Sequence, residues 1–214
     1  MYMSRIKLNL SKRDTILALT NPQMIHGALE VNRPREENDH NRLLWRIDKL
    51  NNEYYLIVVS QEKPKLRQVG EQFGSGSESI ETRDYDQLLD RIHNGSRWVF
   101  RLTVNPSKAA GNNRDSTGRG RRVARSSEKY LREWLQKKSV KNGFSVEEGA
   151  YKCVSVQRVQ FQKKHRGKPV SFIEATFEGI LEVTDEALFK KMLCHGIGKE
   201  KAYGMGLMTI LPVS

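Results

Sequence analysis

Cysteine is scarce in this chain of 214 residues, where only Cys153 and Cys194 occur, far apart and outside any C-x-x-C pair. Two such cysteines argue against a disulfide scaffold and against a zinc site built from thiolates. Histidine is scarce as well, because the five histidines are dispersed and form no H-x-x-x-H pair. The sequence therefore predicts no bound metal ion.

Long apolar runs are also missing. No stretch approaches the roughly 20 apolar residues that a membrane-spanning helix needs. The first ten residues alternate polar and apolar side chains and lack the continuous apolar region of a secretory signal. With so little cysteine, we expect a protein of the reducing cytoplasm that has no membrane partner.

Acidic residues are outnumbered, since 37 Lys and Arg face 25 Asp and Glu and give a formal charge of +12. Such an excess destabilises a compact chain by self-repulsion and indicates a polyanionic partner. Nucleic acid is the first candidate, and an anionic membrane surface is the second. The 37% of hydrophobic residues suffices for a core in one large domain or two small ones.

The first half has the order strand, helix, strand, strand, helix, strand, which is that of the ferredoxin-like split βαβ arrangement. Alternation of polar and apolar residues predicts the strands, and apolar residues at helical spacing predict the helices. These elements are expected at 2–10, after Asn21-Pro22, and at 43–47, 54–60, 84–92 and 98–104.

The second half repeats this pattern. A helix is expected from Ser126 or Ser127, and Thr184 or Asp185 can cap the last helix, which Gly196 would end. Strands are expected at 154–161, 174–183 and 207–211.

The fold class predicted from these patterns is α+β, with two tandem ferredoxin-like (βαββαβ) domains at 1–106 and 126–214. Between them, residues 107–125 are rich in Gly, Ser, Asn and Arg. This composition predicts a linker, or a loop that RNA orders.

Several short motifs are distributed along the whole chain. They are the Met-Tyr start, Asn21-Pro22-x-x-x-His26, Leu44-Trp45-Arg46, Phe100-Arg101-Leu102-Thr103-Val104-Asn105-Pro106-x-Lys108, Phe177-Glu178-Gly179 and Gly196-Ile197-Gly198-x-x-Lys201-x-x-Gly204-x-Gly206-Leu207. In these motifs the chain resembles the CasE (Cse3) family, the repeat-cleaving endoribonucleases of type I-E CRISPR systems. The resemblance implies two ferredoxin-like domains, metal-independent cleavage at the base of a repeat RNA hairpin, and residence in the multisubunit Cascade complex.

The resemblance places His26 at the family's catalytic position, although by spacing alone it is an ordinary polar residue near a helix start. A histidine suits proton transfer because its pKa lies near neutrality. It would act as base on the 2′-hydroxyl or as acid on the departing 5′-oxygen. Family members carry a tyrosine three residues earlier, where this chain has Gln23. Glutamine does not titrate, so either Gln23 has only a positioning role or the second proton carrier lies elsewhere.

The other histidines are not expected to be catalytic; they are His40, His93, His165 and His195. Two basic groups are the expected RNA-binding surfaces. The first lies in the segment 107–125, where arginines can bind phosphates bidentately, and consists of Arg114, Arg119, Arg121, Arg122 and Arg125. The second lies on a predicted hairpin and its turn, which the resemblance places against an RNA stem, and consists of Arg158, Lys163, Lys164 and Arg166. For each group the alternative is a solvated basic surface.

The glycine-rich segment 196–206 matches neither a phosphate-binding loop nor a dinucleotide fingerprint, so no ATP, NAD or other cofactor is expected. Lys199 and Lys201 add charge to it, and Lys201 occupies the family's lysine position. The resemblance favours packing beside the active site and RNA. The alternative is a tight helix-to-strand connection, and both can hold.

The leading hypothesis is a hairpin-specific endoribonuclease that cuts CRISPR precursor RNA by 2′-hydroxyl attack. It would leave a 2′,3′-cyclic phosphate or 3′-phosphate and a 5′-hydroxyl, and would retain the guide hairpin in Cascade. The alternatives are a non-catalytic RNA-binding subunit of the same assembly and a generic basic DNA-binding protein. Ferredoxin-like folds host many functions, so the fold alone does not choose.

Overall fold

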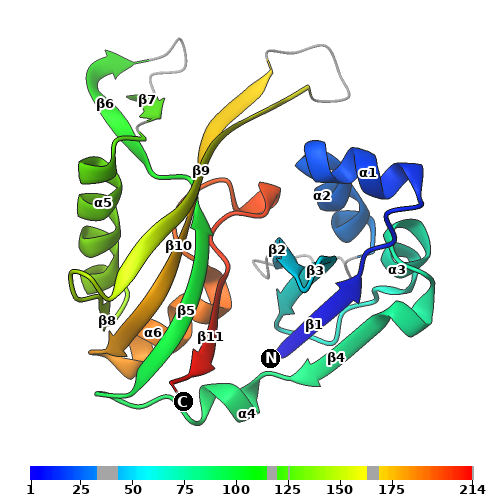
Figure 1. Ribbon diagram of the computed structural model, residues 1–214, viewed down its shortest axis with the longest axis horizontal. Coiled ribbons are helices and arrows are strands. Elements are labelled where there is room, and N and C mark those ends of the chain that lie inside the picture. Colours follow the sequence, from blue (N-terminus) through cyan, green and yellow to red (C-terminus); the bar gives the residue numbers. More distant parts are fainter. Residues whose placement is uncertain (33–42, 115–119, 125, 163–168, 214) are drawn as a thin grey trace.

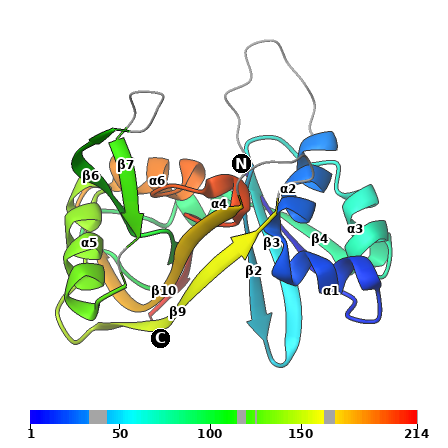
Figure 2. The ribbon, with the colours of Figure 1, turned by 90° about the horizontal axis from the view of Figure 1, so that it is seen from above.

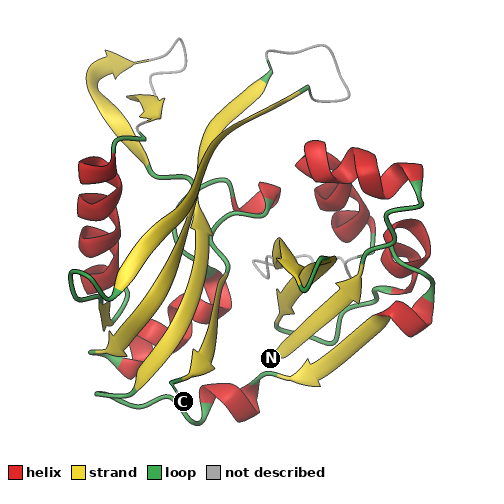
Figure 3. Ribbon diagram, in the orientation of Figure 1, coloured by secondary structure: helices red, strands yellow, loops and turns green. Residues whose placement is uncertain are grey.

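The computed structural model describes residues 1–32, 43–114, 120–124, 126–162 and 169–213, with the backbone alone from 108 to 124. Two antiparallel sheets lie side by side, and each is covered by helices (Figures 1 and 3). None of the described helices is long and apolar enough to cross a membrane.

The first unit has the strand order β2-β3-β1-β4, in which the first strand pairs with the third and fourth. This is the ferredoxin-like order. Its helices lie together on one face of the sheet (Figure 2), and Ile25 and Phe73 pack there against Ile6 and Leu56. Its elements are β1 (Tyr2–Lys7), α1 (Arg13–Thr20), α2 (Pro22–Val31), β2 (Leu44–Leu50), β3 (Glu53–Ser60), α3 (Arg67–Phe73), η1 (Ser77–Ser79) and β4 (Ile80–Asp84).

The second unit has the strand order β11-β5-β10-β8, and β9 also pairs with β10. Two helices cover this sheet. Leu135 of α5 and Phe189 of α6 pack against Leu102 and Phe177 of the sheet. Its elements are α4 (Asp86–Leu89), β5 (Arg97–Val104), β6 (Ser107–Arg114), β7 (Gly120–Ala124), α5 (Glu128–Lys141), β8 (Phe144–Ser145), β9 (Tyr151–Phe161), β10 (Val170–Val183), α6 (Glu186–His195), η2 (Lys201–Tyr203) and β11 (Met208–Pro212).

The predicted pair of ferredoxin-like units is thus confirmed, but one strand was assigned to the wrong unit. The strand expected to complete the first domain is β5, and it pairs with β10 and β11 in the second sheet. The last strand of the first sheet is instead β4. The helix expected at 84–92 shrinks to the single turn of α4, because α3 already supplies the second helix of the first unit.

The segment 107–125, expected to be a linker or loop, contains a hairpin of β6 paired with β7. The cap predictions for α6 are confirmed. Asp185 caps α6 by accepting a hydrogen bond from the Leu188 N–H at 2.9 Å, and Gly196 ends the helix at a φ of 71°. Ser127 rather than Ser126 is the residue before α5, without a side-chain cap bond.

Arg46 of β2 joins the two units through a buried fork, since only 2% of the residue is exposed. Its guanidinium contacts both carboxylate oxygens of Asp48 at 2.6 and 2.7 Å. It also donates to the carbonyls of Arg101 and Leu207 and to the Thr209 hydroxyl, all in the second unit. Because a planar guanidinium fixes the direction of every donor, this side chain orients one sheet against the other.

Candidate active site

His26 lies on α2 where that helix meets the second unit. Asn21 caps the helix by accepting a hydrogen bond from the Gln23 N–H at 3.2 Å, and Pro22 occupies the first helical position. Both residues favour a helix start here. The His26 side chain is 28% exposed, so its imidazole is held in place yet can reach a ligand in solvent.

Two side chains flank the imidazole. Glu30, one turn later on the same helix, places Oε1 4.0 Å from His26 Nδ1. The ring of Tyr203 contacts the His26 imidazole edge-on, with the ring centroids 6.0 Å apart and the ring planes at 79°. A partly exposed imidazole beside a carboxylate and an aromatic ring is suited to exchange protons with a bound substrate.

Tyr203 belongs to η2, the turn that contacts both α2 and β2 (Figure 1). The glycine-rich segment 196–206 holds η2 in place. The Gly206 N–H donates to the Thr103 carbonyl at 2.7 Å, and the Ile197 N–H donates to the Gly206 carbonyl at 2.9 Å. Gly204 has a φ of 83°, and a Cβ there would lie 2.9 Å from the Trp45 ring. Glycine is therefore needed for both backbone angle and close approach.

A cluster of aromatic rings also contacts Tyr203. Phe172 stacks on it at 6.1 Å, and Phe161 meets it edgewise at 4.9 Å. These two residues come from the hairpin of β9 and β10. The cluster thus fixes the tyrosine ring from the second unit while His26 contacts it from the first.

Tyr203 was not among the residues expected from the sequence. Its one local signal is that it is the single aromatic residue within the glycine-rich segment. Among the expected residues, Gln23 lies one turn before His26 on α2 and therefore on a neighbouring part of the same helix surface. Lys201 shares η2 with Tyr203, and its Nζ donates to the His195 carbonyl at 2.6 Å. Lys199 is exposed and forms a backbone bridge with Asn105.

The expected RNA-binding residues are only partly described. Arg158 is exposed on β9, and its Nε donates to the Ser171 hydroxyl at 3.0 Å. Backbone positions alone are described for three residues of β6 and β7, namely Arg114, Arg121 and Arg122. Outside the described residues lie Arg119, Arg125, Lys163, Lys164 and Arg166, together with His40 and His165.

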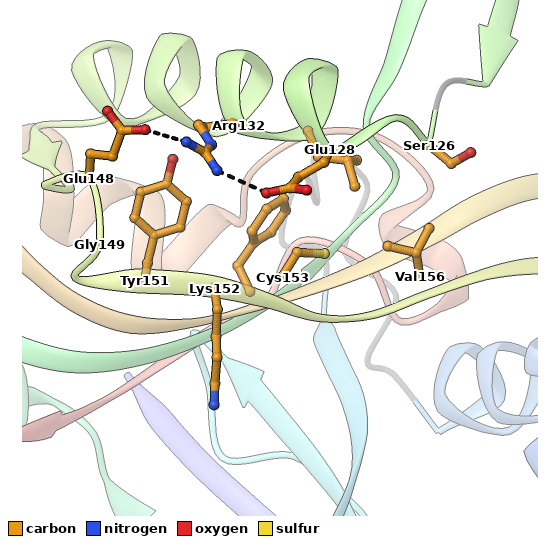
Figure 4. A pocket seen from close by; sticks show the side chains of 11 residues that line it. Ser126, Glu128, Arg132, Glu148, Gly149, Tyr151, Lys152, Cys153 and Val156 are labelled. Atoms are coloured by element: carbon orange, nitrogen blue, oxygen red, sulfur yellow. Dashed lines mark hydrogen bonds and ion pairs between the residues drawn. The ribbon is translucent and has the colours of Figure 1, made fainter.

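A separate cavity of about 610 Å³ lies between α5 and β9 (Figure 4). Arg132 lies across it, paired with Glu128 at 2.9 Å and also with Glu148. Burial raises the pKa of the Cys153 thiol in its wall, which makes that group a weak nucleophile at neutral pH. No residue of α2 or η2 lines this cavity, so it is distinct from the His26 site.

No cluster of three or more potential metal ligands occurs within the described part of the chain. Glu30 and Tyr203 flank His26, and Gln23 lies one turn earlier on the same helix.

Comparison with known proteins gives full-length matches. The model of the family described as CRISPR associated protein matches residues 1–212. The CRISPR-associated endoribonuclease Cse3 of Thermus thermophilus is 28% identical over 224 aligned positions, which cover 99% of this chain and 100% of the relative.

Solved structures match over the same length. Thermus thermophilus Cse3 bound to an RNA representing a pre-cleavage complex has a TM-score of 0.79 at 25% identity, covering 99% of this chain and 98% of that one. A chain of a CRISPR RNA-guided surveillance complex in a pre-nicking state has a TM-score of 0.69 at 24% identity, and both chains are covered fully. The match to the surveillance-complex chain supports the fold of the present chain.

Proposed function

This chain belongs to the CRISPR associated protein family, and we propose that it is a Cse3-type endoribonuclease that cleaves CRISPR precursor RNA within its repeats. We propose further that it retains the guide RNA hairpin as a subunit of Cascade. The full-length relation to the Thermus enzyme and the net charge of +12 both support an RNA substrate.

The observation that carries the catalytic part of the proposal is the placement of His26 at the junction of the two units, against Tyr203. In the proposed reaction the 2′-oxygen forms a bond to the adjacent phosphorus while the bond from phosphorus to the 5′-oxygen breaks. The 2′-hydroxyl loses a proton and the 5′-oxygen gains one. The products are a 2′,3′-cyclic phosphate and a 5′-hydroxyl, and His26 performs one of the two proton transfers.

Neighbouring groups would align the phosphate. Gln23 can donate its amide N–H to a phosphate oxygen but does not titrate, so its proposed role is positioning. Lys199 and Lys201 belong to the same segment as Tyr203 and are proposed to stabilise the negative charge on the RNA. Alignment of the attacking oxygen and charge stabilisation together lower the barrier without a metal ion.

The basic segments are proposed to bind the RNA stem. The first proposed set lies on and around the hairpin of β6 and β7 and comprises Arg114, Arg119, Arg121, Arg122 and Arg125. The second lies on and beyond β9 and comprises Arg158, Lys163, Lys164 and Arg166. An RNA duplex is bound mainly through its shape and backbone, which suits long cationic side chains.

The test is single-turnover cleavage of a labelled repeat hairpin from the host, with EDTA in excess. Wild type is compared with His26→Ala and with His93→Ala, which removes an exposed histidine beyond α4. We expect His26→Ala to bind the hairpin normally but to cleave about 10²–10⁴-fold more slowly, as for loss of a general acid or base. A hairpin with a 2′-deoxy nucleotide at the cut should remain intact.

Equal rates for His26→Ala and wild type would refute the catalytic assignment. Cleavage that returns only with added divalent metal would refute the metal-independent mechanism. Tight binding of the hairpin without cleavage by wild type would favour a non-catalytic RNA-binding subunit.

A further inference from the structure

A cavity of about 330 Å³ lies between the two units and adjoins the His26 site. The corner between α1 and α2 forms one part of its wall, and β2, β5, β9 and β10 contribute others. Pro22 and Tyr203 line it, and Tyr203 is the residue whose ring contacts His26. A ligand in this cavity would therefore lie beside the proposed cutting site.

The cationic side chains in the wall are already engaged by carboxylates. Arg46 forms its buried fork with Asp48. Arg101 lies 3.3 Å from an Asp48 oxygen and is also paired with Glu178. Their charge is compensated within the protein, so the cavity is not built to attract a phosphate.

The wall also carries a half-buried carboxylate. Oε1 of Glu174, on β10, accepts a hydrogen bond of 2.6 Å from the Gln157 amide on β9. Burial raises the pKa of Glu174. A carboxylate would repel a phosphate, but its oxygens accept hydrogen bonds from the N–H groups of a nucleobase.

A hydrogen-bond donor lies in the same wall. Trp45 is only 3% exposed, and its indole Nε1–H has no acceptor among the described residues. A buried donor without a partner is costly, so a ligand acceptor that reached this group would stabilise it. The half-buried ring of Tyr54 adds an apolar surface to the wall.

Building on the proposed function, we propose that this cavity binds one unpaired base of the RNA next to the cut. Guanine fits best, because its N1–H and N2–H groups can donate to Glu174 while its O6 can accept from Trp45. Sequence-specific RNA recognition commonly uses such splayed bases, bound along their Watson–Crick edge. The cavity would add base specificity to a protein whose other contacts are expected to involve mainly the RNA backbone.

The test uses repeat hairpins made uncleavable by a 2′-deoxy nucleotide at the cut, each with one abasic nucleotide at an unpaired position flanking it. Dissociation constants are measured for wild type, Glu174→Gln and the control Glu182→Gln, which changes an exposed glutamate on the same strand. At one position, we expect the abasic nucleotide to weaken binding by wild type and by the control about 5- to 150-fold, the range for a bidentate base contact. The same change should weaken binding by Glu174→Gln less than it weakens binding by wild type, since the amide has one acceptor oxygen and no longer accepts from both base N–H groups. Inosine lacks the N2 amino group of guanosine. Replacing guanosine by inosine at this position should therefore weaken binding by wild type more than binding by Glu174→Gln.

Equal losses in all three proteins at every position, or no loss at any position, would overturn the pocket assignment. If Glu174→Gln does not fold, Gln157→Ala replaces it, because this exposed residue orients the carboxylate. Loss of the abasic discrimination in that variant supports the assignment, and its full retention overturns it. A wild type that neither binds nor cleaves the unmodified hairpin would instead overturn the proposed function.

Discussion

The ring of Tyr203 lies in edge-type contact with the imidazole of His26, with centroids 6.0 Å apart, although the two residues belong to different units of the chain. His26 comes from α2 of the first unit, and Tyr203 comes from η2 of the second. The orientation of the proposed proton carrier therefore depends on how the two units are joined. Substitutions far from the RNA should affect cleavage through this contact.

Two substitutions of Tyr203 distinguish the contribution of its ring to cleavage from that of its hydroxyl group. Tyr203→Phe keeps the ring and should retain most of the cleavage rate, whereas Tyr203→Leu removes the contact with His26. An aromatic pair contributes about 0.5–1.5 kcal/mol, so the leucine variant should cleave about 2- to 10-fold more slowly than the phenylalanine variant. Single-turnover rates at saturating protein measure this. An equally large loss in both variants would show that the hydroxyl group, not the ring, is what matters.

Gly204 is predicted to tolerate no side chain because two effects coincide there. Its φ of 83° strains any other residue, and an added Cβ would lie 2.9 Å from Trp45. Gly95 is a matched control, with a φ of 79° and no atom within 4 Å of an added Cβ. Gly95→Ala should cost about 1–2 kcal/mol of stability from backbone strain. Gly204→Ala should cost about 1–3 kcal/mol more and should slow cleavage, because η2 would have to shift. Chemical denaturation of both variants would reveal the difference, and equal costs would contradict it.

Local patterns predicted several elements correctly because their causes lie close together in the sequence. In β10, the alternating Ala175, Phe177, Leu181 and Val183 are all buried, as a half-buried strand requires. The cap at Asp185 depends on a backbone N–H three residues away. By contrast, α3 was missed because seven residues with few apolar positions give too weak a periodic signal.

Pairing partners were not predictable in the same way. Alternation showed that β5 is a strand, but its place beside β10 and β11 is decided by long-range packing of Phe100 and Leu102 in the second core. The candidate site has the same limitation. His26 was identified through the family resemblance, whereas Tyr203 becomes adjacent only when the units pack together.

Arg46 should contribute most of its stabilisation through the junction between the units. Arg46→Met leaves Asp48 buried with one fewer partner and is expected to cost about 3–5 kcal/mol, the range for breaking a buried ion pair. Arg5→Met is the control, since the Arg5–Glu81 pair at 2.8 Å is about half exposed and should contribute less than about 1 kcal/mol. Urea denaturation measures both. The double variant Arg46→Met/Asp48→Leu should lose less than the sum of the single variants, and strict additivity would contradict the coupling.

Glu174 should make stability depend on pH in a defined direction. Burial raises the pKa of its carboxyl in the folded protein above the value in the unfolded chain. The folded state therefore favours the protonated form. The contribution of this residue is most favourable below the unfolded pKa and is lost as pH rises through the folded pKa.

Glu174→Gln removes this titration while keeping the size of the side chain. The variant should melt at a higher temperature than wild type at alkaline pH, where the half-buried carboxylate is ionised and costly. The difference should shrink as the pH falls through the raised pKa of the wild-type carboxyl, which then gains a proton. Thermal denaturation of both proteins across this pH range measures it, with Glu182→Gln as the exposed control. A gap between wild type and Glu174→Gln that does not change with pH would show that Glu174 carries no titration-linked cost. The free-energy cost of Glu174 to the folded state should be present without RNA and should be relieved when RNA binds. That outcome would indicate that the carboxylate serves recognition rather than stability.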